Sequence, residues 1–300
     1  MSTTPQLYPR AHAERNPDKP AAIMAESGQT LSYAQLEAQA SQLGRFYQTL
    51  GLKTGDHVAY CVENRLECLS LQWGAHYAGL YYTFISNRLT AHEAAYIVED
   101  CDALVLVVTA KTGPAILDAI RALPRPPRLY SLDPISGVPL LSEALADIDS
   151  APLLGTLEGS DMLYSSGTTG RPKGVKPALT GQPLGTTCTI GGLMQRGFGV
   201  NETSVYLSPA PYYHAAPLKW AHGMTALGGT VVMLEKFDAE KTLAAIDRYG
   251  VTHSQWVPTM FHRLLALPDA VKAKYSLASQ KVAVHAAAPC PVPTKQAMID

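Results

Sequence analysis

The sequence of 300 residues has few charged side chains and no excess of either sign. Asp, Glu, Lys and Arg make up 16% of it, which is low against the fraction of about 25% that is typical of soluble domains. The 24 basic and 25 acidic residues give a formal net charge of −1. Because a nucleic-acid-binding protein is expected to show a basic excess or stripe, we expect no nucleic-acid partner. The low charge favours a large core, or apolar surface that a further partner covers.

The sequence also lacks the segments that mark export, membrane insertion or cross-linking. It contains no run of about 18 apolar residues, so no transmembrane segment is expected. Residues 1–20 include Arg10, Arg15 and Lys19 without an apolar stretch, so no secretory signal is expected. The five cysteines are an odd number and form no Cys-X-X-Cys pair, which is typical of reduced thiols. We therefore expect a cytoplasmic protein; the sequence carries no signal for its oligomeric state.

Short apolar runs alternate with amphipathic stretches along the whole chain. The runs predicted as strands are residues 21–24, 57–61, 103–109, 205–207, 230–234, 253–257 and 281–284. They are bounded by turn residues, and helical patterns separate them. This alternation predicts an α/β fold with layered, mostly parallel sheets and helices on both faces.

Capping signals predict where several helices begin. Three pairs of residues have the spacing of a capping box: Ser32 with Gln35, Asn64 with Glu67, and Thr90 with Glu93. Asp238 is expected to cap a helix over residues 239–249, which Gly250 ends.

The sharpest motif covers residues 162–175, Met-Leu-Tyr-Ser-Ser-Gly-Thr-Thr-Gly-Arg-Pro-Lys-Gly-Val. Its apolar start, residues 162–164, is predicted as a short strand. The glycines allow a tight turn that approaches a ligand closely, and consecutive backbone N–H groups in such a turn form an anion site. Lys173 adds a mobile cation that can reach a phosphate. The spacing differs from a Walker loop, in which Ser or Thr follows the lysine. The motif predicts a phosphate-binding loop rather than a flexible surface loop.

Residues 164–175 are similar to the nucleotide-binding signature of the adenylate-forming superfamily. This superfamily contains acyl-CoA synthetases, aryl-CoA ligases, firefly luciferase and the adenylation domains of peptide synthetases. Further segments that resemble it are residues 30–36, 55–59, 87–96, 256–260 and 285–289. The resemblance implies that residues 1–300 form an incomplete AMP-binding N-terminal domain. About residues 1–150 would be a first α/β subdomain, and residues 151–300 a second one that carries the phosphate loop.

The resemblance implies an AMP-forming acid:CoA ligase. Such an enzyme would activate a hydrophobic fatty or aryl carboxylic acid with ATP as an acyl-adenylate, and then form a thioester with CoA. Since a carboxylic acid is already ionised at neutral pH, the protein supplies positioning and charge neutralisation rather than a base. Mg²⁺ is implied as a cofactor, but the Glu that holds it has no counterpart here. The small C-terminal domain has none either, so we expect little or no ligase activity from these 300 residues alone.

The resemblance also assigns roles to individual residues. The residues expected to hold the ATP phosphates are Ser165, Ser166, Gly167, Thr168, Thr169, Gly170 and Lys173. Among them, Thr168 and Lys173 are candidate catalytic residues. His214, at the end of Pro-Ala-Pro-Tyr-Tyr-His, is expected to line the acyl pocket, to gate entry of the thiol and to be catalytic. The remaining candidates are Trp220 and Met224 as acyl contacts, and Ala286, Ala287 and Ala288 as a flat surface for the adenine ring.

Several alternatives stay open. A lone histidine, apolar residues at helical spacing and a short strand-to-helix loop all occur for structural reasons alone. The chain could be a non-catalytic ATP-binding fragment. It could also adenylate an acid for a carrier protein or for a luciferase-like oxidation. After Val175, residues 176–181 replace the Thr-His pair with which many members of the superfamily cap the next helix, which predicts a redesigned or later helix start.

Overall fold

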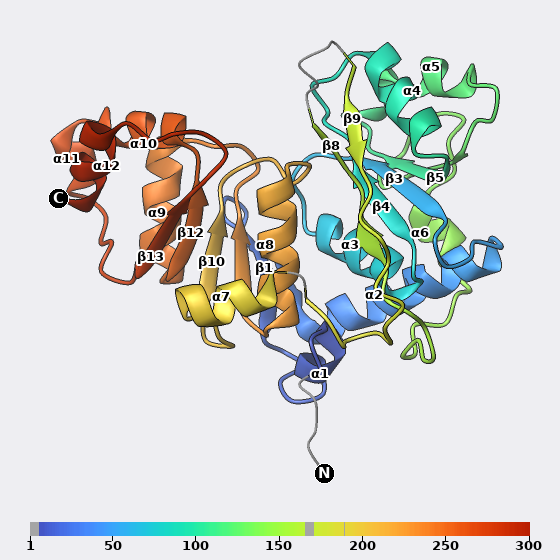
Figure 1. Cartoon of the computed structure of the whole chain (residues 1–300), viewed down its shortest axis with the longest axis horizontal. Coiled ribbons are helices and arrows are strands. Elements are labelled where there is room, and N and C mark those ends of the chain that lie inside the picture. Colours follow the sequence, from blue (N-terminus) through green and yellow to red (C-terminus); the bar gives the residue numbers. More distant parts are fainter. Residues whose placement is uncertain (1–5, 166–170, 189) are drawn as a thin grey trace.

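The computed structural model describes residues 6–165, 171–188 and 190–300. Figure 1 shows two β-sheets, a group of helices between them, and further helices on both outer sides. The predicted α/β class, with layered sheets and helices on both faces, is confirmed.

The two sheets are built almost wholly from parallel strands. Across the larger sheet the order is β13 (Val282–His285), β12 (His253–Trp256), β10 (Val205–Ser208), β11 (Thr230–Met233), β1 (Pro20–Met24) and β2 (Thr30–Ser32). Across the smaller sheet it is β6 (Arg128–Ser131), β5 (Ala103–Val108), β3 (His57–Cys61), β4 (Tyr81–Phe84) and β7 (Ser160–Asp161). Only β1 and β2 pair antiparallel within these sheets. Most of these strands before residue 150 lie in the smaller sheet, and most of those after it lie in the larger sheet. The exceptions are β1 and β2, which lie in the larger sheet, and β7, which lies in the smaller sheet. The two halves of the molecule are the smaller and the larger sheet, each with its loops and helices.

The helices differ widely in length. In chain order the described helices are α1 (Pro9–Ala13), α2 (Tyr33–Thr49), α3 (Glu67–Tyr77), α4 (Ala91–Asp100), the 3₁₀-helix η1 (Gly113–Ala115), α5 (Leu117–Arg121), α6 (Leu141–Ala144), α7 (Gly191–Phe198), α8 (Ala215–Ala226), α9 (Ala239–Tyr249), α10 (Pro258–Leu265), α11 (Asp269–Lys272) and α12 (Val292–Ile299). No helix in the described part of the chain combines the length and apolarity needed to cross a membrane.

Helices α2, α3 and α8 form a middle layer that both sheets share. Side chains alternate along a strand, so each strand can serve two cores. In β5, Val105 and Val107 belong to the core around the middle layer, whereas Leu106 and Val108 pack with α4 and α5 outside. Strands of the larger sheet also serve two cores: Tyr206 of β10 belongs to the core around the middle layer, and Leu207 packs with α9 and α10 on the outer side. The result is five layers, helix–sheet–helix–sheet–helix (Figure 1).

Most of the predicted helix starts are confirmed. Ser32 and Thr90 each form a complete capping box at the start of α2 and α4. The Asp238 side chain accepts a hydrogen bond from the backbone N–H of Lys241, and Gly250 ends α9 in the left-handed conformation at φ 60°. After Val175 the next described helix is α7, which begins only at Gly191, so the later helix start is also confirmed.

The predicted capping box at Asn64 is wrong. Helix α3 begins at Glu67, and its N-cap residue Leu66 makes no side-chain cap. The Asn64 side chain instead forms hydrogen bonds with backbone groups of Ala210, Tyr212 and Leu234, which lie 146 to 170 residues further along the chain. These long-range partners compete with the local helix end, and the spacing of Asn64 and Glu67 could not show them.

The contact between α3 and α8 joins the two halves through buried histidines. The His222 ring stacks on Trp73 with the ring centroids 4.0 Å apart, and it meets the edge of His76 at 4.8 Å. The Nδ1 atoms of both histidines have no hydrogen-bond partner among the described residues. Burial lowers the pKa of His76 and lowers that of His222 well below its usual value. Both side chains are therefore neutral in the folded protein at neutral pH.

These lowered pKa values predict that the protein loses stability in mild acid. Below a pH of about 6.5 the unfolded chain binds protons at both histidines, whereas the folded chain does not, so the free energy of unfolding falls as the pH drops. In His222→Gln this fall should lessen by up to about 1.4 kcal/mol between pH 6 and pH 5. Urea unfolding at pH 7, 6 and 5 measures it, with the exposed His92→Gln as control. An unchanged pH dependence in His222→Gln would contradict the assignment.

Candidate functional site

The loops that follow the strands decide where a ligand can bind. In open parallel sheets, ligands bind beyond the carboxyl ends, where neighbouring strands connect in opposite directions. In the larger sheet this point lies between β10, which leads to β11 on one side, and β12, which leads to β13 on the other. In the smaller sheet it lies between β3, which leads to β4, and β5, which leads to β6.

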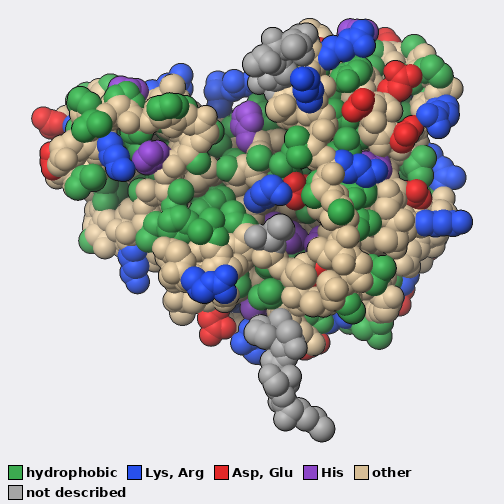
Figure 2. All heavy atoms as spheres, viewed as in Figure 1, with side chains coloured by type: hydrophobic (Ala, Val, Ile, Leu, Met, Phe, Trp, Pro, Cys, Tyr) green, Lys and Arg blue, Asp and Glu red, His purple; other side chains and the backbone are tan. Residues whose placement is uncertain are grey.

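A cleft of about 350 Å³ lies beyond these carboxyl ends. Its lining comes from loops after β3, β4, β5, β10 and β11 and from α10: residues 62–64, 87–88, 111, 211, 213–214, 235–237, 259–260 and 263. Both sheets therefore contribute to one hollow. Figure 2 shows the surface notched between the two halves of the molecule.

The cleft carries more positive than negative side chains. Its cationic lining residues are Arg88, Lys111, Lys236 and Arg263, and its carboxylates are Glu63 and Glu235. Cationic side chains gathered in a cleft with low-dielectric walls attract anions and raise their local concentration. The arrangement suits a ligand with several negative charges.

His214 lies in this cleft, as the last residue before α8. Its backbone is extended, at φ −80° and ψ 147°, so its side chain leaves the loop just where the helix begins. Partial burial and the positive charge of Arg88 lower the pKa of His214, which favours its neutral form. A neutral imidazole at this position can donate or accept a hydrogen bond without adding a charge to the cleft.

The phosphate-loop motif forms the two strands of a hairpin. β8 (Leu163–Ser165) pairs antiparallel with β9 (Lys173–Val175), and Ser165 lies opposite Lys173. Both of these side chains are exposed. The other predicted phosphate ligands, Ser166, Gly167, Thr168, Thr169 and Gly170, lie outside the described residues.

The first half of the molecule holds this hairpin. The Tyr164 hydroxyl donates a hydrogen bond to Asp100 at 2.5 Å. The Arg171 guanidinium lies 5.5 Å from the centre of the Tyr96 ring, on the same helix as Asp100. Beyond the hairpin, the Lys176 ammonium lies over the Tyr81 ring at 4.6 Å. These contacts set the direction in which the motif leaves the sheet.

Trp220 and Met224 lie in the core and not in the lining of the cleft. Both are buried on α8, and Trp220 stacks on Tyr206 of β10 with the ring centroids 5.6 Å apart. Phe198 of α7 meets the same indole at 5.5 Å. Their predicted contact with an acyl group stays a prediction.

Ala286, Ala287 and Ala288 form a strained turn directly after β13. The backbone N–H of Ala286 donates to Trp256 at 3.1 Å, which continues the pairing of β12 and β13. Ala287 has φ 71°, the left-handed region that costs a residue with a Cβ atom about 1 kcal/mol. Ala287 and Ala288 are exposed. Their predicted role against an adenine ring stays a prediction.

No sequence signal pointed to the basic residues as parts of one cleft, and Asn64 was predicted only as a helix cap. Arg88 lies in the segment 87–96 that resembles the superfamily, but Lys111, Lys236 and Arg263 lie in no motif. Only the meeting of both sheets places them together. In the described part of the chain, no group of three or more His, Cys, Asp and Glu side chains is placed to hold a metal ion.

Comparison with known proteins gives the class of this molecule. The family model of the AMP-binding enzyme matches residues 9–300, and the chain belongs to this family. The N-terminal domain of FACL13 from Mycobacterium tuberculosis, solved with an inhibitor, superposes with a TM-score of 0.82 at 25% identity, over 100% of this chain and 73% of that one. The fold is therefore that of the N-terminal domain of adenylate-forming enzymes.

Curated relatives are similar along most of the chain. Acyl-CoA synthetase 7 of Caenorhabditis elegans is 29% identical over 299 residues, which cover 94% of this chain and 54% of the relative. The fatty acid–[acyl-carrier-protein] ligase ScoC of Streptomyces coeruleorubidus is 28% identical over 261 residues, which cover 86% of this chain and 48% of the relative. The chain thus spans about half the length of these relatives.

The strain at Ala287 is directly testable. Ala287→Gly should raise the free energy of unfolding, or leave it unchanged, because glycine adopts φ 71° without a steric cost. Ala288→Gly, at a neighbouring position without positive φ, should lower it by about 0.5–1 kcal/mol because it only adds freedom to the unfolded chain. Urea unfolding compares the two variants. Equal losses in both would show that Ala287 is not strained.

Proposed function

We propose that this chain is the ATP- and acid-binding part of an AMP-forming acid:CoA ligase. The observation that carries the proposal is the basic cleft at the carboxyl ends of both sheets, with His214 in its wall. Both ATP and CoA carry several phosphate charges, which the cationic lining would attract. The membership in the AMP-binding family and the names of the relatives support the same reaction class.

The reaction would proceed in two steps. A carboxylate oxygen of the acid attacks the α-phosphorus of ATP, the bond from that phosphorus to the β-phosphate oxygen breaks, and pyrophosphate leaves. The thiol sulfur of CoA then attacks the acyl carbonyl, and AMP leaves with the carboxyl oxygen. The first step needs charge neutralisation on the leaving phosphates, a role proposed for Lys173 and for the hydroxyls of Ser165, Ser166, Thr168 and Thr169.

The acid is proposed to be a hydrophobic fatty or aryl acid. Tyr213, Phe237 and Met260 contribute apolar surface to the cleft beside the basic residues. His214, which lines the same cleft, is proposed to border the acyl group and to gate the approach of the thiol.

The role of the phosphate loop predicts the effect of removing one charge. In the protein as its source cells produce it, Lys173→Ala should lower acid-dependent exchange of pyrophosphate into ATP by about 100-fold, because the charge on the departing pyrophosphate is no longer balanced. Lys176→Ala is the control, since Lys176 lies on the Tyr81 ring and outside the loop. Thr168→Ala is a second test of the loop.

Unchanged exchange in both Lys173→Ala and Thr168→Ala would remove the loop from the mechanism. Binding of ATP without any exchange in the unmodified protein would favour a non-catalytic nucleotide-binding role.

A second candidate function keeps the adenylation step and changes the acceptor to a carrier protein. The similarity to the fatty acid–[acyl-carrier-protein] ligase is the observation that favours it. The cationic cleft suits either acceptor, because the phosphopantetheine arm of a carrier protein and CoA both present a phosphate before the thiol.

The acceptor is decided by competition. With one activated acid, equal concentrations of CoA and of a phosphopantetheinylated carrier protein should yield mainly acyl-CoA. The products are counted by mass spectrometry, with a carrier protein that lacks its pantetheine arm as control. Predominant acylation of the carrier protein would assign the chain to the second function.

A further inference from the structure

Asn64 links the two halves of the molecule at the cleft. It follows β3 of the smaller sheet and is 7% exposed. Its side-chain Nδ2 donates hydrogen bonds to the carbonyl oxygens of Ala210 at 3.0 Å and Leu234 at 2.8 Å. Its Oδ1 accepts one from the backbone N–H of Tyr212 at 2.7 Å. Ala210 and Tyr212 follow β10, and Leu234 follows β11, so all three partners lie just beyond strands of the larger sheet.

Only a side-chain amide satisfies these three groups. Two carbonyl oxygens need two N–H donors, and the N–H of Tyr212 needs an acceptor on the same small side chain. A carboxylate has no donor for the carbonyls, and an apolar side chain of the same size satisfies none of the three. Buried backbone groups without a partner are costly, so the loop would move if Asn64 were replaced.

The loop that Asn64 holds is the one that carries His214. Tyr212 is 1% exposed, its hydroxyl donates to Gln72 of α3, and its ring lies 5.0 Å from that of Phe84 in β4. The backbone N–H of His214 in turn donates to Pro211 at 3.2 Å. A loop that belongs to the larger sheet is thus anchored at two points on the smaller one.

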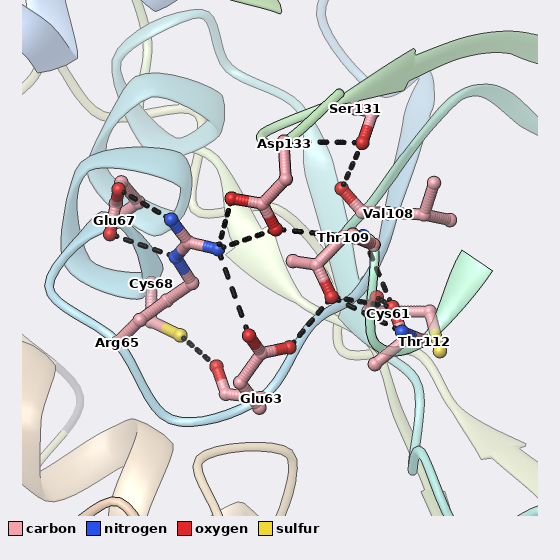
Figure 3. Close-up of polar contacts among 11 residues, drawn as sticks. Cys61, Glu63, Arg65, Glu67, Cys68, Val108, Thr109, Thr112, Ser131 and Asp133 are labelled. Carbon is pink, nitrogen blue, oxygen red and sulfur yellow. Dashed lines mark hydrogen bonds and ion pairs between the residues drawn. The ribbon is translucent and has the colours of Figure 1, made fainter. Parts of the chain in front are cut away.

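The neighbours of Asn64 in the chain are anchored as well, as Figure 3 shows. Glu63 accepts a hydrogen bond from the Thr109 hydroxyl at 2.7 Å. Arg65 donates to both oxygens of Glu67, at 2.9 and 3.0 Å, and to both oxygens of Asp133, at 3.1 and 3.2 Å. These contacts join the loops after β3, β5 and β6. Asn64 therefore projects from a segment that is held on both sides.

We propose that Asn64 is a positioning residue, which fixes the loop 210–214 and thereby places His214 in the cleft. Its side chain holds a loop of the larger sheet in a fixed position relative to the smaller sheet. The catalytic consequence rests on the proposed function, in which His214 gates the thiol: a displaced loop should slow thioester formation more than adenylate formation. The structural part of the proposal does not depend on any activity.

The structural part is tested in the 300-residue chain by two readouts at the loop. In Asn64→Leu, hydrogen exchange at the Tyr212 amide should rise by about tenfold or more, because its acceptor is gone. The pKa of His214, measured by NMR titration, should rise toward its usual value as the ring leaves the cleft and Arg88. His214→Gln identifies the signal.

Gln42→Met is the matched control for loss of a side-chain amide. Gln42 Nε2 also donates to two backbone carbonyls, those of Leu145 at 3.0 Å and Ile148 at 2.9 Å, but it is not among the residues that line the cleft. This variant should leave both readouts unchanged. Should Asn64→Leu not fold, the smaller Asn64→Ala removes the same donors and the same acceptor without adding bulk or charge. A pKa of His214 and a Tyr212 exchange rate that stay as in the unmodified chain, in whichever variant folds, would overturn the proposal.

The catalytic part is tested in the protein as its source cells produce it. Asn64→Leu should lower the kcat of thioester formation about tenfold more than the rate of pyrophosphate exchange. Gln42→Met should change neither the kcat of thioester formation nor the rate of pyrophosphate exchange. If His214→Ala leaves both half-reactions unchanged, the proposed role of His214 fails, whereas the exchange and titration results still decide the role of Asn64. Equal slowing of both half-reactions in Asn64→Leu would overturn the link to the thiol step.

Discussion

Burial of the middle helical layer against two sheets at once is the constraint on which the rest of the structure depends. Helix α3 shows it most clearly, because every residue from Cys68 to Tyr77 is buried. A helix that is buried all round, with the polar Ser70, Gln72 and His76 among apolar residues, has no face left for water. Since α2 and α8 share this layer, the two sheets cannot separate without exposing all three helices. The low proportion of charged residues in the sequence follows from the same architecture.

Enclosure of this kind leaves little room for charged side chains, and ion pairs hold two of the buried carboxylates, Glu37 and Asp161. Arg10 and Glu37 meet at 2.9 Å near α1 and α2, and Lys219 of α8 meets Asp161 of β7 at 2.8 Å. The second pair joins the two halves, as do the stacked rings at Trp73. Removing one member of such a pair leaves the other charge without a partner, which is costly in a buried site. These contacts therefore favour one particular arrangement of the elements that they join. They fix which surfaces of the two halves meet, and hence which loops border the cleft.

Local signals in the sequence predicted the local structure well. The capping boxes at Ser32 and Thr90 were readable because both partners lie within one turn of helix. Most of the predicted strands were readable as short apolar runs, such as β5 and β11, whereas β4 (Tyr81–Phe84) of the smaller sheet was not predicted. Asn64 had the same local pattern as Ser32, yet its side chain serves backbone groups 146 to 170 residues away. No local pattern distinguishes these two cases, because the decision depends on which loop the fold brings alongside.

The same reasoning explains why the motif could be recognised and the cleft could not. The hairpin of β8 and β9 is one continuous segment, so its glycines and Lys173 stand together in the sequence. The cleft is assembled from loops beyond five strands and from α10, and apart from His214 its lining carries no sequence motif; Lys111, Lys236 and Arg263 look in sequence like ordinary surface residues. A site of this kind can be rigid only if the loops are tied across the halves. A side-chain amide with three partners meets that need at low cost, since it adds no charge to the cleft and leaves none of those three groups unpaired.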